Sequence, residues 1–126
     1  MGAPNYFSDL CAEFKLFYER LVFPYLTYNT ERLCCNEHKI PVILIMTSNA
    51  PEDYYTELLA KYKQTLDTFI GPTEVLVSGE TLQVKDYSKF NWTLFDPEQR
   101  KQRRETIFPQ ELQKAFSMGA EMARKI

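Results

Sequence analysis

A segment suited to holding a flat ligand lies at the start of the chain and consists of Gly2, Ala3, Pro4, Asn5, Tyr6 and Phe7. Glycine and proline let the backbone approach a ligand closely, and aromatic rings can stack against a planar molecule. The segment therefore predicts a contact with a flat ring. Burial of Tyr6 and Phe7 in the protein core is the alternative interpretation.

A second candidate segment contains Thr47, Ser48 and Asn49. Their hydroxyl, amide and backbone groups could hydrogen-bond the polar edge of a ligand. The alternative is an ordinary turn in which small polar residues cap the following helix.

No group of side chains for acid, base or nucleophilic catalysis is evident. The chain shows no Ser-His-Asp arrangement, no Gly-rich phosphate loop and no pair of carboxylates that the pattern places across a cleft. We therefore predict no catalytic side chain. This is typical of a protein whose redox step belongs to a bound cofactor, and equally of a protein that does no chemistry.

The three cysteines, Cys11, Cys34 and Cys35, do not have the spacing of a disulfide framework or a zinc site. Glu37 and His38 lie near the adjacent pair, but His38 is the only histidine. We interpret the cysteines as ordinary thiols in a reducing compartment and predict no metal site.

The apolar run at residues 41–47, PVILIMT, is the element that must position the second candidate segment. It carries no charge, which is typical of a parallel strand buried on both faces. Loops at the carboxyl ends of such strands gather around ligands. We therefore expect Thr47 and the residues after it to lie beside any ligand.

A helix and a second strand follow this run. The helix begins near Pro51, ends at Gly71 and Pro72, and has the apolar positions Tyr55, Leu59, Tyr62, Leu66 and Phe69. Residues 74–78 (EVLVS) predict the strand, which residues 81–84 could extend. Residues 41–78 thus predict a strand–helix–strand unit with parallel strands.

Helices are also predicted on both sides of this unit. The first starts from a cap at Ser8 or Asp9, and its expected core positions are Leu10, Phe14, Phe17 and Leu21. The last opens at Pro109, and its expected core positions are Leu112, Phe116, Gly119 and Ala123. A short helix from Asp96 carries a basic run at residues 100–104, which we interpret as a solvated face. A contact with the phosphate of NADPH or with an acidic partner is the alternative.

Length and composition predict a single domain over residues 1–126, with 44% hydrophobic and 25% charged residues. The net charge of −2 argues against a nucleic-acid partner. Apolar runs fall far short of the roughly 20 residues of a membrane helix. We therefore expect a cytoplasmic protein with no membrane partner.

Five segments, taken in order, carry a family resemblance: GAPNYFSD, FYERLVFPYLTYN, PVILIMTSNAPE, VKDYSKF and FDPEQRKQRRETIFPQELQKAFSMGAEMA. Together they resemble the flavodoxin-like NAD(P)H-dependent FMN reductase family, including its iron-sulfur flavoprotein branch. The resemblance implies an α/β, flavodoxin-like three-layer sandwich with a parallel sheet. It also implies that residues 2–7, with Ala3 in place of the usual serine, wrap the flavin ring after a strand. Residues 47–49 match the next flavin-side loop.

The resemblance covers only the C-terminal two-thirds of a family member. The first strands and the phosphate-binding loop of the family have no counterpart, so we expect a truncated flavodoxin-like domain. Phosphate cradles at helix N-termini are the most directional part of such sites. FMN binding is therefore expected to be weak or to depend on a partner that supplies the loop.

Two functions follow from the resemblance. The first is an FMN-dependent oxidoreductase that transfers electrons from NAD(P)H through FMN to a small acceptor such as a quinone or a flavin. The second is a non-catalytic remnant or interaction domain that needs a partner chain. We expect a homo-oligomer, such as a dimer, or a complementing N-terminal chain. Tyr18, Phe23, Tyr25 and Tyr28 are candidate contact residues, since aromatic side chains are enriched in interface cores.

Overall fold

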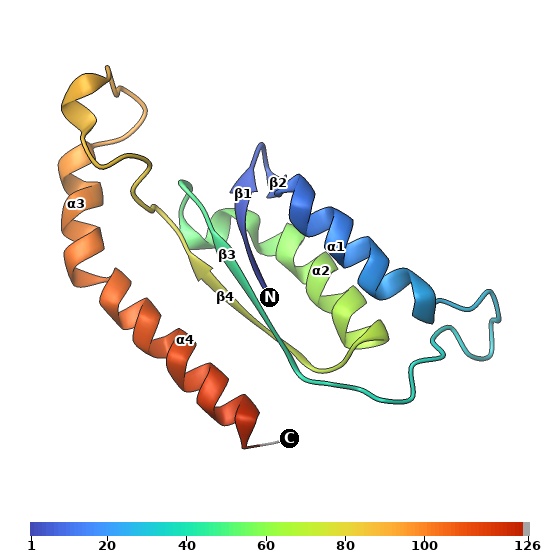
Figure 1. Ribbon diagram of the computed structural model, residues 1–126. Coiled ribbons are helices and arrows are strands. Elements are labelled where there is room, and N and C mark those ends of the chain that lie inside the picture. Colours follow the sequence, from blue (N-terminus) through green and yellow to red (C-terminus); the bar gives the residue numbers. More distant parts are fainter. Residues whose placement is uncertain (125–126) are drawn as a thin grey trace.

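A four-stranded sheet forms the centre of the computed structural model, which describes residues 1–124 (Figure 1). The strands are β1 (Gly2–Tyr6), β2 (Asp9–Leu10), β3 (Val42–Thr47) and β4 (Thr73–Ser78), in the spatial order β2-β1-β3-β4. Strands β1, β3 and β4 are parallel, which confirms the α/β class and the strand–helix–strand unit. The last two positions of the expected domain, 125 and 126, lie outside the described residues.

The expectation of a purely parallel sheet is wrong. Strand β2 pairs antiparallel with the end of β1, with Asn5 opposite Leu10 and Tyr6 opposite Asp9. The two residues between these strands form a tight turn, and only antiparallel strands can be joined by so short a connection.

The helices lie on both sides of the sheet (Figure 1). Helices α1 (Ala12–Val22) and α2 (Thr56–Phe69) cover one face, while α3 (Pro97–Thr106) and α4 (Phe108–Ala123) lie on the other side, beyond β4. Three single turns of 3₁₀ helix complete the structure: η1 (Phe23–Tyr25), η2 (Glu52–Tyr55) and η3 (Tyr87–Lys89). In this part of the chain no helix has the length and apolar character needed to cross a membrane.

The core fills the space between the sheet and helices α1 and α2. Val42, Leu44 and Met46 alternate along β3 and are buried on this side with Leu66 of α2. Their neighbours on the opposite side of β3 are only half-buried. The expected burial of residues 41–47 on both faces therefore holds for one face, because α4 leaves much of the other uncovered.

The first helix begins later than the sequence predicts. Asp9 belongs to β2, and α1 starts at Ala12 without a side-chain cap. Leu10 and Phe14 are buried as expected, but Phe17 is 51% exposed. Ser8 lies in the turn and Asp9 pairs with β1, so neither residue caps the helix.

The apolar stripe of the last helix is not buried. Leu112 is 56% exposed and Phe116 is 72% exposed, contrary to expectation. Helix α4 is held to the sheet by polar contacts, and the Ser78 hydroxyl donates to Glu111 Oε2 at 2.6 Å. The 3.6-residue period predicted the helix correctly, but it gave no information on whether a partner element covers the stripe.

Candidate functional site

A cavity of about 610 Å³ opens at the carboxyl ends of β1 and β3. We call it the strand-end cavity. Its lining combines aromatic rings, small polar groups and one charged side chain: Asn5, Tyr6, Phe7, Ser8, Ser48, Asn49, Ala50, Pro51, Tyr54, Tyr55, Leu94, Phe95 and Arg100. Cavities of this size, mostly apolar with a few convergent polar groups, are typical of small-molecule sites.

Strand register brings the two candidate segments together. Strands β1 and β3 are parallel neighbours, and Pro4 lies opposite Thr47 in their register. Strand β3 therefore ends level with Pro4, and β1 continues past this point to Tyr6. A smaller cavity of about 230 Å³ shares Asn5, Tyr6, Ser48 and Asn49 with the strand-end cavity and extends to Thr81 and Gln83 after β4.

Seven of the nine predicted ligand-contact residues line one or both cavities: Pro4, Asn5, Tyr6, Phe7, Thr47, Ser48 and Asn49. The other two, Gly2 and Ala3, lie further back in β1. Gly2 lies opposite Ile45 in the sheet, and Ala3 is buried in the core at 8% exposure. The structure therefore gives these two residues a role in strand packing.

The turn between β1 and β2 holds an aromatic ring at the cavity mouth. Phe7 and Ser8 have φ angles of 51° and 66°, and Phe7 is fully exposed. A two-residue hairpin with both φ angles positive favours Asn-Gly, and other side chains cost roughly 1 kcal/mol or more there. The chain thus carries backbone strain at the point where Phe7 meets the cavity.

The loop after β3 is shaped by its own hydrogen bonds. The Ser48 N–H donates to the carbonyl of Ser78, and the Ser48 hydroxyl accepts from the Ala50 N–H, each at 3.0 Å. Ser48 is 4% exposed, so these two hydrogen bonds hold the loop on its buried side. Asn49 Oδ1 is also buried, but it has no hydrogen-bond partner among residues 1–124. A buried amide oxygen without a partner is costly, and Asn49 is among the residues that line the cavity.

Arg100 is a site residue that the sequence analysis missed. It belongs to the basic run interpreted as a solvated face, yet its side chain is only 8% exposed. Its Nη2 donates to the carbonyl of Asn49 at 3.0 Å, and its Nη1 lies 2.7 Å from Glu80 Oε1. The solvated-face interpretation is therefore wrong for this residue.

Arg103 lies with Arg100 on the buried face of α3. It lies three positions after Arg100, on the same side of the helix, and its side chain is 15% exposed. It forms an ion pair with Glu111 and lies 3.9 Å from Glu80. The two arginines and two glutamates form a neutral network that ties α3 and α4 to the loops after β3 and β4.

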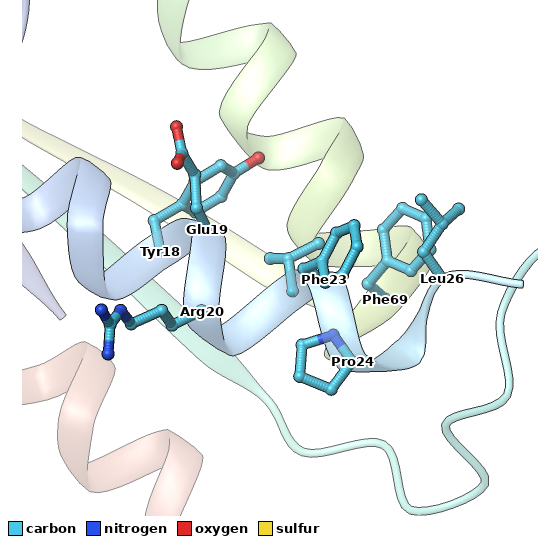
Figure 2. A pocket seen from close by; sticks show the side chains of 8 residues that line it. Tyr18, Glu19, Arg20, Phe23, Pro24, Leu26 and Phe69 are labelled. Atoms are coloured by element: carbon cyan, nitrogen blue, oxygen red, sulfur yellow. The ribbon is translucent and has the colours of Figure 1, made fainter.

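A second concavity lies far from the strand ends, beside the end of α1 (Figure 2). Phe23, Pro24, Leu26 and Phe69 form its apolar part, and Figure 2 shows the Arg20 side chain pointing away from them. This groove offers no convergent polar groups for chemistry. Of the predicted contact residues, Phe23 is 64% exposed, whereas Tyr18 also lines the groove but is partly buried and stacks on Phe14.

Comparison with known proteins gave no match to a protein-family model, to a curated protein or to a solved structure. Within residues 1–124, no group of three or more His, Cys, Asp or Glu side chains is arranged to hold a metal ion. The interpretation of the site therefore depends on its own geometry.

Proposed function

We propose that the strand-end cavity binds the ring of FMN, and that the protein is a flavodoxin-like oxidoreductase that passes electrons from NAD(P)H to a small acceptor such as a quinone or a flavin. One observation carries the proposal. The aromatic turn at Tyr6 and Phe7 and the polar loop at Ser48 and Asn49 form walls of one cavity at the ends of adjacent parallel strands.

The cavity has the groups that a flat, polar-edged ring requires. Tyr6, Phe7 and Tyr54 contribute aromatic rings to the lining, and each is more than half exposed. Asn49 Oδ1, which has no hydrogen-bond partner within residues 1–124, would accept from a ring N–H if the side chain turned toward the ligand. Bound FMN would supply hydride and electron transfer, while these residues would bind and orient the ring and exclude water from it.

The cavity lining suits the phosphate group of FMN less well than it suits the ring. Arg100 is the one charged side chain among the residues that line the two cavities, and it is already paired with Glu80. The lining would therefore offer contacts to the ring, but among residues 1–124 it holds no free cation for a phosphate. This supports weak binding of FMN by this chain alone.

Trp92 provides a direct test of the proposal. Its ring centroid lies 5.2 Å from that of Phe95, which lines the cavity, and it is the only tryptophan. Titration with FMN should quench Trp92 emission and flavin fluorescence together, with saturation at about 100 μM or below. Tyr6→Leu should weaken this quenching, whereas Tyr28→Leu, at a position far from the cavity lining and 90% exposed, should not. No saturable quenching would rule the proposal out.

A second function, a non-catalytic interaction domain, is favoured by a different observation. Strand β2 covers only Asn5 and Tyr6 of β1, so the outer edge of β1 has no strand partner before Pro4 within the described part of the chain. The exposed Leu112 and Phe116 lie on α4. A free strand edge and an uncovered apolar stripe are features that a complementing segment or a second copy would bury.

Sedimentation velocity tests this second function. Self-association that rises with concentration and is lost in Leu112→Glu/Phe116→Glu would support it. The matched control is Gln113→Glu/Ser117→Glu, which adds the same charge on the same helix. A monomer that stays soluble at high concentration would count against it.

A further inference from the structure

The buried side chain of Arg100 joins three segments at or beside the strand-end cavity. Arg100 donates to the carbonyl of Asn49 after β3, pairs with Glu80 after β4, and lies with its guanidinium carbon 4.9 Å from the ring centroid of Phe95 before α3. Loss of this side chain would release all three segments. Arg100 is therefore a positioning residue for the cavity.

Arg100 is the buried member of this pair, with a side chain 8% exposed, whereas the Glu80 side chain is 37% exposed. Burying a charge costs free energy, and Arg100 Nε and Nη1 make no hydrogen bond within residues 1–124. Apolar side chains could pack these loops together at a lower cost in free energy. The charge of Arg100 therefore indicates a role in the electrostatics of the cavity.

The two charges are not equally close to the cavity. Arg100 lines it, whereas Glu80 does not. The positive charge of the pair therefore lies nearer to a molecule bound in the cavity than the negative charge does. In a partly buried site the interaction of such fixed charges is stronger than in water.

We propose that the Arg100–Glu80 pair sets the reduction potential of an aromatic redox ligand held in the strand-end cavity. This inference rests on the proposed function. Hydride transfer from NAD(P)H to FMN yields NAD(P)⁺ and a reduced flavin with one additional negative charge. Arg100 stabilises that charge, and Glu80 moderates the effect, because a fixed charge near the flavin tunes its electronics.

Two substitutions at the pair separate this role from a purely structural one. Arg100→Gln should lower the midpoint potential of bound FMN, and Glu80→Gln should raise it, each changing the ratio of reduced to oxidised flavin about tenfold, or about 30 mV for two electrons. A structural role would predict shifts of the same sign, since either change loosens the same loops. The measurement is a redox titration of bound FMN against reference dyes.

Control variants keep the result interpretable. Lys101→Gln removes an exposed charge on the same helix, where Lys101 pairs with Glu98, and should leave the potential unchanged. Arg100→Lys keeps the charge and should restore most of the wild-type potential. If Arg100→Gln does not fold, the opposite-sign test becomes Glu80→Gln against Arg100→Lys, in which only the former raises the potential.

The outcomes distinguish the inference from the proposed function. Wild-type protein that binds no FMN overturns both. Wild-type protein that binds FMN, with potentials in the two variants that are unchanged or shifted in the same direction, overturns the inference and leaves the proposed function standing.

Discussion

The phenol of Tyr62 on α2 donates a hydrogen bond of 2.8 Å to Oδ1 of Asp9, the first residue of β2. The two residues are 53 positions apart in the sequence. Burial, together with the carboxylate of Asp9, raises the pKa of Tyr62 well above its usual value. This bond anchors the turn that carries Phe7 to the helix below it.

Removing the phenol tests that anchor. Tyr62→Phe should lower the free energy of unfolding by about 1–2 kcal/mol, because a hydrogen bond to a charged group is lost while the ring stays in place. Urea unfolding at neutral pH measures the change. Tyr28→Phe removes a hydroxyl from a side chain that is 90% exposed and should change stability by less than about 0.5 kcal/mol. Equal effects in the two variants would contradict the prediction.

Stability should fall at acid pH through Asp9. Burial alone would raise the pKa of Asp9, but hydrogen bonds from Lys15, Tyr62 and the Leu10 N–H keep its pKa below the usual value. A carboxyl whose pKa is lower in the folded state contributes stability above its unfolded pKa of about 3.9, and this contribution is lost as pH falls through the folded pKa.

The corresponding experiment compares variants across pH. The stability difference between wild type and Asp9→Asn should be largest above about pH 5 and should shrink below about pH 4. Urea unfolding at several pH values measures it. Glu31→Gln changes an exposed carboxylate that makes no ion pair within residues 1–124, so its difference should stay small throughout. A constant difference for Asp9→Asn would contradict this assignment.

Relieving the backbone strain at Phe7 and Ser8 should stabilise the protein and at the same time weaken ligand binding. Phe7→Asn with Ser8→Gly installs the pair that this turn geometry favours and should raise the free energy of unfolding by about 1–2 kcal/mol. It also removes the exposed ring at the cavity mouth, so FMN should bind more weakly. Thermal unfolding and FMN titration measure the two effects. A more stable protein with unchanged FMN affinity would show that Phe7 makes no ligand contact.

Riboflavin and FMN should bind with nearly equal affinity. Among residues 1–124, the cavity lining offers no free cation to a phosphate, because its one charged side chain, Arg100, is paired with Glu80. Removing the phosphate should therefore change the dissociation constant by less than about threefold, or about 0.6 kcal/mol. Trp92 quenching by each flavin measures this. A much tighter complex with FMN would mean that a phosphate site exists elsewhere on this chain.

Local sequence determined the central strand–helix–strand unit of this protein. The uncharged run at residues 41–47, the helical spacing up to Phe69 and the second strand predicted β3, α2 and β4 closely, because period and turn residues act over a few positions. The Asp96 cap of α3 was also correct, since its side chain accepts from the Glu98 N–H at 2.9 Å. Parallel pairing then placed the two candidate segments side by side.

Only the tertiary structure decided which side of each element is covered. Arg100 and Phe116 have ordinary local surroundings in the sequence, yet Arg100 is buried and Phe116 is 72% exposed. Burial depends on what packs against a residue from elsewhere in the chain, and periodicity contains no such information. The antiparallel β2 was missed for the same reason: Asp9 can serve as a helix cap or a strand residue, and pairing with β1 decided between them.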